Sequence, residues 1–294
     1  MNIFLDCFPC FLKQALECAR LSTDDPAQQK RIINIIMRIL IDLDYKETPP
    51  HIARKIYRVI KDITSNDDPY APIRKKDNKE MLAIYDLISE IISREKDRLY
   101  AACRIAAGIN IIDSGTGRRK KDHGIEDIRR ILHADPVIDD FEYFIDDLRN
   151  SKSLLYLGDN SGEIVLDKLF ISIIQNNFSD LNIYFAVRGE SVINDVTIDD
   201  ARDTGMHDIC NVISNGDSAP GTDIMHCSQE FCDIFNNADI IISKGQGNYE
   251  TLSDKTAANI YYMLVAKCHV IAEHLGVEVG SIIIKKGEAC HAYI

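Results

Sequence analysis

The sequence contains no long apolar segment and no dense run of basic residues, and both absences narrow the classes of protein that it can encode. No uncharged stretch reaches the roughly 18 residues of a membrane-spanning helix, and the first residues lack the basic start and apolar run of a secretory signal peptide. We therefore expect a cytoplasmic protein with no membrane partner. The net charge is −12 and the basic residues are dispersed, which disfavours attraction to a phosphate backbone, so we also expect no nucleic-acid partner.

Several hydrolase motifs are absent as well. The eight histidines show neither HxH nor HExxH spacing, so nothing indicates a zinc protease. No Gly-x-Ser-x-Gly elbow is present, and no glycine loop ends in the Lys-Ser or Lys-Thr of an ATP-binding P-loop. The charge-rich stretch 118–123 is interpreted as a solvated loop.

Cysteine is comparatively frequent, with nine residues, and without a secretory signal these are expected to be reduced thiols or metal ligands. Cys7 and Cys10 form a single CxxC pair, which cannot complete a tetrahedral zinc site alone. Further ligands would have to come from Cys103, Cys268, Cys290 or His291. Buried structural thiols are the alternative interpretation, so the role of Cys7 and Cys10 stays open.

The two halves of the 294-residue chain differ in their pattern of apolar residues. Residues 7–150 carry the apolar spacing of amphipathic helices, and Thr48-Pro49-Pro50 and Asn66-Asp67-Asp68-Pro69 mark the start and end of one of them. After Ser151, β-rich runs alternate with segments that can form helices. The predicted strands are Leu154–Leu157, Ile183–Val187, Asn211–Ser214, Ile240–Ser243, His269–Ala272 and Ile282–Ile284.

This alternation predicts an α/β fold, with a mainly parallel, Rossmann-like α/β/α sheet domain at 151–294 preceded by an all-helical domain at 1–150. Polar clusters follow three of the predicted strands, at 158–163, 188–197 and 243–250. The carboxyl ends of adjacent parallel strands share one edge of a sheet. We therefore expect these clusters to meet in one ligand-binding crevice.

The side chains of these clusters suit a hard cation and an oxyanion. Asp159, Asn160 and Asp195 offer carboxylate and amide oxygens of the kind that bind Mg²⁺ or Mn²⁺. Lys244, followed by Gly245 and Gly247, can bring a positive charge and free N–H groups to a phosphate. Each cluster taken alone is also consistent with an ordinary turn, a helix cap or a surface lysine; their coincidence at three strand ends favours a site.

Three segments resemble the signatures of the damage-control phosphatase family, also known as domain of unknown function 89. They are Gly158-Asp159-Asn160-Ser161-Gly162-Glu163, Asn194-Asp195-Val196-Thr197 and Lys244-Gly245-Gln246-Gly247-Asn248. The resemblance covers nearly the whole chain and extends to the CxxC start of the microbial stand-alone branch. Further matching segments are Asp68-Pro69-Tyr70 with Lys75 or Lys76 and Asn78, residues 107–113, Ser214-Asn215-Gly216 and Pro220-Gly221-Thr222.

The resemblance implies a divalent-metal-dependent phosphatase that hydrolyses small phosphometabolites such as sugar phosphates, with a damage-control role. It implies metal ligation by Asp159, Asn160 and Asp195, which together with Lys244 form the expected catalytic set, and Mg²⁺, Mn²⁺, Co²⁺ or Ni²⁺ as the cation. Water would attack in line without a covalent intermediate, and Glu163 would act as base or as an orienting group. The expected substrate-binding residues are Ser161, Gly162, Glu163, Asn194, Gly245, Gly247, Asn248, Asp68, Tyr70 and Asn78.

The sequence departs from the family pattern near Asp195. Arg188 stands where several relatives carry lysine, and the proline that often precedes the Asn-Asp pair is missing. Two other functions stay open at this point. A glycine turn after the first strand also occurs in adenosylmethionine-dependent methyltransferases, although the usual GxGxG run is absent and Lys244 would have no role. A non-catalytic metal- or metabolite-binding protein is the other alternative.

Overall fold

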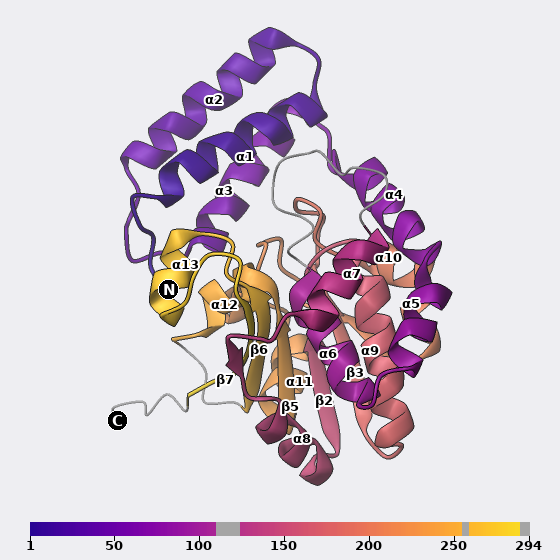
Figure 1. Cartoon of the computed structure of the whole chain (residues 1–294). Helices are drawn as coiled ribbons and strands as arrows, with labels where there is room; N and C mark the ends of the chain where they lie inside the picture. The colour runs from indigo at the N-terminus through magenta and orange to yellow at the C-terminus, as the bar shows by residue number, and fades with distance from the viewer. Residues whose placement is uncertain (110–123, 255–258, 289–294) are drawn as a thin grey trace.

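The structure is a computed structural model that describes residues 1–109, 124–254 and 259–288. Helices from the first half of the chain lie above and beside a twisted sheet built mainly from the second half (Figure 1). The stretch 118–123, the end of segment 107–113 and the pair Cys290 and His291 lie outside the described residues.

The first three helices form a small unit with its own core. They are α1 (Cys7–Ser22), α2 (Pro26–Ile41) and α3 (Pro49–Thr64). Asp25 caps α2 through a hydrogen bond from the amide of Ala27 at 2.8 Å, and proline begins both α2 and α3, where its missing N–H costs nothing. The predicted limits of α3 are confirmed. Ile32, Ile36 and Ile52 are fully buried between these helices.

The next helices connect this unit to the sheet. They are α4 (Ala71–Leu82), α5 (Tyr85–Ser93), α6 (Arg98–Gly108), α7 (Gly124–His133) and, after the short strand β1 (Ile138–Asp139), α8 (Phe141–Asn150). Helix α6 packs against α9 (Glu163–Asn177) and against the sheet. The close packing follows from small side chains, because Ala101, Ala102, Ala106 and Ala107 are all buried.

Within the described residues, the sheet has seven strands in the order β1-β7-β6-β5-β2-β3-β4. The remaining strands are β2 (Ser153–Leu157), β3 (Asn182–Val187), β4 (Asn211–Ser214), β5 (Ile240–Lys244), β6 (Ile260–Val265) and β7 (Ile282–Lys286). All neighbours are parallel except β6 and β7. Strand β2 therefore lies between β3 and β5, which places the three polar clusters side by side at one edge.

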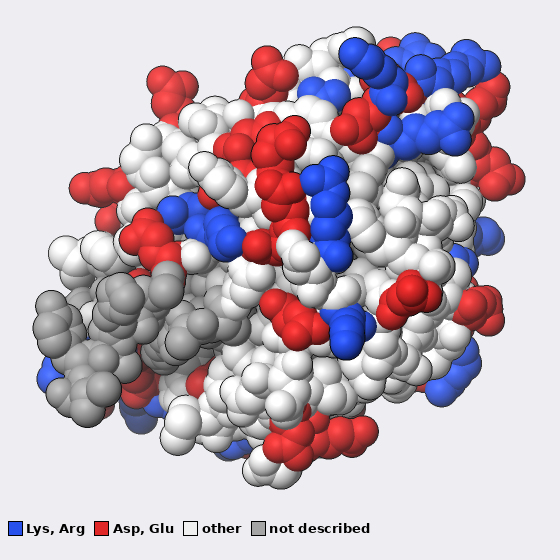
Figure 2. All heavy atoms as spheres, turned by 90° about the horizontal axis from the view of Figure 1, so that it is seen from below, with Lys and Arg blue, Asp and Glu red and all other residues white. Residues whose placement is uncertain are grey.

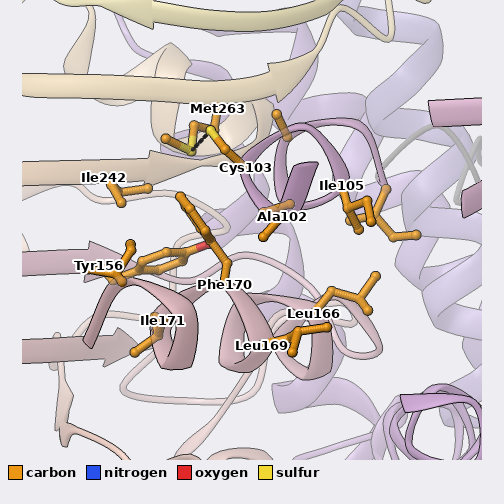
Figure 3. Close-up of a cluster of buried hydrophobic side chains, with 14 of the residues drawn as sticks. Ala102, Cys103, Ile105, Tyr156, Leu166, Leu169, Phe170, Ile171, Ile242 and Met263 are labelled. Atoms are coloured by element: carbon orange, nitrogen blue, oxygen red, sulfur yellow. Dashed lines mark hydrogen bonds between the residues drawn. The ribbon is translucent and has the colours of Figure 1, made fainter. Parts of the chain in front are cut away.

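Side chains alternate between the two faces of the sheet. On one face, Tyr156 and Ile242 pack against Phe170 of α9, and the thiol of Cys103 lies 3.9 Å from the sulfur of Met263 (Figure 3). The other face is covered by α11 (Gln229–Asn237), α12 (Gly245–Leu252) and α13 (His269–Leu275). Continuous apolar strands are expected when both faces are buried.

The predicted fold class is confirmed, and five of the predicted strands coincide with β2, β3, β4, β5 and β7. The strand predicted at His269–Ala272 is wrong, because these residues form the first turn of α13, whose Ile271 and Ala272 pack against the sheet. Their short apolar run suits either structure. Strand β6 was not predicted, although its six residues are all buried. Strand β1 was not predicted either, because its two residues are too few to show an alternating apolar pattern.

The division at residue 150 stays a prediction. Strand β1 precedes that boundary and pairs with β7, so the sheet includes residues from both halves. No helix within the described ranges is long and apolar enough to cross a membrane. On the face in Figure 2, acidic and basic side chains are interspersed, and a basic group at one edge is bordered by acidic residues.

Candidate functional site

The turn after β2 brings carboxylate and amide groups into a buried position. Asp159 and Asn160 are less than a tenth exposed, and the Asn160 amide donates to Asp159 Oδ2 at 2.8 Å and to Glu163 Oε1 at 2.9 Å. Gly162 begins the following turn at φ 76°, a conformation that glycine adopts readily. The first predicted cluster thus places all of its oxygen-bearing side chains at the start of α9.

The loop after β3 is joined to this turn by main-chain hydrogen bonds. The amide of Ser161 donates to the carbonyl of Asn194 at 2.8 Å, and the amide of Val196 donates to the carbonyl of Asp159 at 2.8 Å. Asn160 and Asp195 form an isolated antiparallel bridge. These bonds hold Asp195, 3 % exposed, beside Asp159 and Asn160. The two loops are far apart in the sequence, so only the fold brings them together.

The turn after β5 closes the site from the other side. A Cβ atom on Gly245 would lie 1.9 Å from Asp159 Oδ2, and the φ of this residue is 77°. Only a residue without a side chain therefore lets α12 begin against the Asp159 carboxylate. Gly247 is similarly close to the carbonyl oxygen of Pro220, 2.0 Å from an added Cβ, which brings the 215–222 loop to the same edge.

Lys244 is fully buried, and its ammonium group donates to Asp167 Oδ1 at 2.5 Å and lies 3.6 Å from Glu163 Oε2. Tyr156 also donates to Asp167 Oδ1, at 2.6 Å. Burial alone would lower the pKa of Lys244, but Asp167 and Glu163 outweigh it and raise that pKa. The lysine is therefore a fixed cation behind Glu163, and contact with a phosphate stays a prediction.

Arg188 is a site residue that was not among the predicted set. Its Nε donates to Asp195 Oδ2 at 2.7 Å, and its Nη1 to Asn248 Oδ1 at 3.2 Å. Thr222 donates to the same Asn248 oxygen at 2.8 Å. The second guanidinium nitrogen, Nη2, is buried without a hydrogen-bond partner in the described structure. The position of Arg188 directly after β3 was the signal that could have identified it.

The buried acids of the site repel one another. Burial raises the pKa of Asp195 to about 7, with Asp159 adding to the effect and Arg188 opposing it. Burial also raises the pKa of Glu163 to about 8, against the opposing charge of Lys244. Buried carboxylates with raised pKa values at a strand edge are typical of functional sites, because a fold that only needed stability would gain by avoiding them.

Residues of the helical half reach the site through α4. Asn78 accepts from the amide of Gly162 at 2.7 Å and donates to Asp200 Oδ1 at 2.9 Å. Arg74 donates to Asp200 Oδ2 at 2.9 Å and pairs with both oxygens of Asp68. Asn78 therefore supports the glycine turn directly, while Asp68 acts through Arg74. Neither Arg74 nor Asp200 was among the predicted site residues.

A cavity of about 250 Å³ lies between α3, the Asp68-Pro69-Tyr70 segment and the loop before Asp195. Tyr70 lines it, as do Tyr57, Arg58 and Lys61. Burial is the main cause that raises the pKa of Tyr57 well above its usual value, and the charge of Asp195 adds to it. The cavity therefore lies close enough to the buried acids for the charge of Asp195 to act on a side chain in its wall.

The first two clusters do not act as ordinary helix caps. Gly162, at the N-cap position of α9, provides no side-chain cap. The cap of α10 (Ile198–Asp203) is Thr197, in a capping box with Asp200, so Asp195 has no capping role. Ile193 has a φ of 45°, which is rare for a β-branched residue and often found at functional sites.

One protein family matches nearly the whole chain. The family described as "Damage-control phosphatase ARMT1-like domain" matches residues 3–283. The chain belongs to the damage-control phosphatase family. A crystal structure of a DUF89 family protein from Pyrococcus horikoshii matches 98 % of this chain and 100 % of that chain, with a TM-score of 0.90 and 27 % sequence identity.

Curated relatives agree with this membership. A damage-control phosphatase of Archaeoglobus fulgidus is 31 % identical over 97 % of this chain and 99 % of its own length. One from Pyrococcus horikoshii is 28 % identical over 98 % of this chain and 99 % of its own length. An uncharacterised protein of Methanocaldococcus jannaschii is 34 % identical over 96 % of this chain and 94 % of its own length. The names of the first two relatives support a metabolite-repair phosphatase, in agreement with the family predicted from the sequence.

Proposed function

We propose that the protein is a divalent-metal-dependent phosphatase of small phosphate esters such as sugar phosphates. The observation that carries the proposal is the convergence of Asp159, Asn160 and Asp195 in one buried cluster, joined by the main-chain bridge between two strand-end loops. Because these groups are hard oxygen donors, the set suits Mg²⁺, Mn²⁺, Co²⁺ or Ni²⁺. The raised pKa values of Asp195 and Glu163 support it, since they arise mainly from burial and in part from the charge of Asp159, and a bound cation would stabilise the charged carboxylates against both.

A divalent ion at this position would polarise phosphoryl oxygens and make a coordinated water more acidic. The chain itself supplies the remaining functions. Arg188, with its partnerless Nη2, provides a buried donor beside Asp195 for an equatorial phosphoryl oxygen. The glycine turns after β2 and β5 lie at the amino ends of α9 and α12, where the helix dipoles favour an anion.

Glu163 is placed to handle a proton. Its Oε1 accepts from Asn160, while Oε2 faces the Lys244 ammonium at 3.6 Å. A bound cation would lower the pKa of Glu163 from its raised value of about 8, and the ionised carboxylate can then accept a proton from the attacking water and release it again. Lys244 moderates that pKa and, itself anchored by Asp167, holds Glu163 in position. In this scheme Lys244 is a positioning residue, and no covalent intermediate is formed.

The neighbouring cavity supports a small anionic substrate. Its volume of about 250 Å³ suits a metabolite, and its wall contains both basic side chains, such as Arg58 and Lys61, and the acidic side chains of Asp62, Asp67, Asp68 and Glu190. Lys61 is shared with Asp67 and Glu190, whereas Arg58 forms no ion pair within the described ranges. We therefore expect Arg58 to attract the alcohol portion of the substrate, which becomes the leaving group.

The test compares phosphate release by the wild type and by Asp195→Asn from a panel of sugar phosphates and an aryl phosphate, with each of the four cations. We expect metal-dependent release in the wild type. Loss of a residue that only orients a metal ligand lowers activity about 10- to 100-fold, so loss of the ligand itself should lower it by about 100-fold or more. Asp199→Asn, the same change at an exposed residue of α10, should leave release unchanged.

Normal turnover in purified Asp195→Asn would refute the assignment of Asp195. A wild type that releases no phosphate with any cation would refute the proposed activity. Titration with adenosylmethionine would then separate the methyltransferase alternative from a non-catalytic metabolite-binding protein.

A further inference from the structure

A second group of metal-ligating side chains lies outside the buried cluster at the strand ends. His51, Asp223 and His226 each offer one ligand atom, and these atoms all lie within 4.8 Å of one another. His226 Nδ1 is 2.9 Å from Asp223 Oδ2, and His51 Nδ1 is 3.3 Å from the same oxygen. The group joins the helical unit to the α/β unit, because His51 belongs to α3 and the other residues follow β4.

Local structure explains why Asp223 and His226 act together. Asp223 precedes the 3₁₀ turn η3 (Ile224–His226), and His226 is its last residue. Residues three apart in such a turn project from the same side. His51 lies in the first turn of α3, which is pinned by Pro49 and Pro50. Two rigid pieces of backbone therefore present their side chains to one another, and the rings of the two histidines meet edge to face with centroids 5.5 Å apart.

The spacing fits a transition metal. Bonds of about 2.0–2.2 Å to nitrogen and oxygen in a tetrahedral site put neighbouring ligand atoms about 3.3 Å apart. The separations from Asp223 Oδ2 are 2.9 Å and 3.3 Å, and all three ligand atoms lie within 4.8 Å of one another, so the two histidines would have to close around the ion. His226 is 47 % exposed, which leaves room for solvent ligands and for entry of the ion.

Glu47 supplies the support that metal-binding histidines usually have. Its Oε2 lies 3.3 Å from His51 Nε2, the ring nitrogen opposite the one that faces Asp223. The charge of a carboxylate beside one ring nitrogen favours the proton there and makes the other nitrogen, Nδ1, the one whose lone pair can accept a bond or bind a metal. Lys55 holds Glu47 through contacts of 3.0 Å and 2.8 Å.

Arg54 fills part of the same space. Its Nη2 donates to His51 Nδ1 at 2.8 Å and lies 3.4 Å from Asp223 Oδ2. This nitrogen therefore bridges His51 Nδ1 and the Asp223 carboxylate. A metal ion bound between them would have to displace Nη2 and take over its positive charge beside Asp223. Arg54 would retain its Nη1 bonds to both oxygens of Asp217, at 2.8 Å and 2.9 Å.

We propose that His51, Asp223 and His226 form a second divalent-cation site, of the two-histidine, one-carboxylate type that suits Zn²⁺ or Co²⁺. This site is separate from the hard-oxygen set of Asp159, Asn160 and Asp195, and it does not depend on the proposed phosphatase activity. The bound ion would link α3 to the loop that contains Thr222, which donates to Asn248 beside the strand-end cluster. It would therefore act as a structural clasp between the two units.

The experiment uses the full chain, stripped of metal by chelation, in an Asp195→Asn background that removes a ligand of the first site. Bound Co²⁺ is counted by equilibrium dialysis, and its visible spectrum reports the ligand type. We expect one tightly bound Co²⁺ with a nitrogen and oxygen spectrum. His226→Ala should weaken its binding at least about 10- to 100-fold, and Glu47→Gln, which only orients His51, should weaken it to a lesser degree within that range.

His207→Ala is the matched control, since His207 is also an exposed histidine in a 3₁₀ turn, η2 (Met206–Asp208). It should bind Co²⁺ as the background does. Zn²⁺ should also raise the melting temperature of the background and of His207→Ala but not of His226→Ala. Equal affinity in His226→Ala and its background would overturn the proposal.

Cys227 tests the ligand set, because its thiol bonds to the carbonyl oxygen of Asp223 at 3.4 Å. We expect Cys227→Ser to keep both the affinity and the spectrum. A thiolate-to-cobalt charge-transfer band that disappears in Cys227→Ser would show a different site and overturn the proposed one.

Discussion

At the residue scale, the Asp159 carboxylate depends on the absence of a side chain at position 245. The distance of 1.9 Å from an added Cβ to Asp159 Oδ2 is far below any real contact, and the positive φ adds backbone strain to any substitution. Asp159 is buried and Asn160 already donates to it, so the carboxylate cannot move aside without disturbing the rest of the set.

Gly245→Ala should therefore lower phosphate release by about 100-fold, since displacement of a reacting group by about 1 Å has an effect of that size. The measurement is the steady-state rate with the best cation and substrate of the panel. Gly276→Ala is the control, because Gly276 also has a positive φ of 68° but no atom near its added Cβ. That variant should lose about 1–2 kcal/mol of stability and keep its turnover. Full activity in Gly245→Ala would contradict the geometry.

At the scale of elements, α8 is attached to the sheet by a carboxylate that accepts hydrogen bonds from two strands. Asp147 Oδ2 accepts from Tyr261 of β6 and from Lys286 of β7, both at 2.5 Å. Burial would raise the pKa of Asp147, but the bonds from Lys286 and Tyr261 outweigh it, so the pKa is lowered. The ionised form is thus favoured in the folded state, and the interaction adds stability only while Asp147 is charged.

Asp147→Asn should reduce the free energy of unfolding by about 0.5–1.5 kcal/mol at pH 7, a range that allows for partial exposure of the pair. The contribution is complete above the unfolded pKa of about 3.9 and is lost as pH falls through the lower folded value. The difference between variant and wild type should therefore shrink in acid. Urea unfolding at pH 7 and pH 3 measures it. Asp146→Asn, at an exposed position of the same helix, is the control; a difference that does not change with pH would exclude the charged bonds as its cause.

At the scale of the whole molecule, a buried ion pair joins the helical unit to the α/β unit. Arg54 and Asp217 are 7 % and 6 % exposed and are bonded through both carboxylate oxygens. Such a pair need not stabilise the fold relative to apolar residues, but the loss of one partner leaves an uncompensated charge in the interior. The connection between the units is therefore sensitive to this one contact.

Arg54→Ala should destabilise the protein by about 3–5 kcal/mol. Its neighbour Lys55, an exposed residue paired with Glu47, provides the control, and Lys55→Ala should change stability by no more than about 1 kcal/mol. Urea unfolding followed by circular dichroism measures both. If Arg54→Ala unfolds at the wild-type urea concentration, the pair does not hold the units together.

The extent of prediction from sequence differs between the fold and the site. Apolar period and proline placement predicted α3, five strands and the α/β class, because these are local properties of the chain. The motif residues Asp159, Asn160, Asp195 and Gly245 were predicted to share one edge, and the structure brings them together there. Charged and glycine-rich segments are recognisable as turns from their composition, whereas the short apolar run at 269–272 suited either a strand or a helix.

Pairings between distant segments were not predictable. Nothing local in Arg188 or Asp167 indicates that the first holds Asp195 or that the second holds Lys244. No pattern in the chain connects His51 with Asp223, which lie 172 positions apart. Such contacts depend on how helices dock on the sheet, and that docking is decided by the sum of many weak apolar contacts.

The sequence by itself determined the family, the strand-helix alternation and the chemistry available at the strand ends, because each depends on residues that are close together in the chain. The tertiary structure alone decided the order of the strands, the depth at which Lys244 is buried and the cavity between the two units. The physical reason is that side-chain identity sets which groups are present, whereas burial and distance set their charge state and partners.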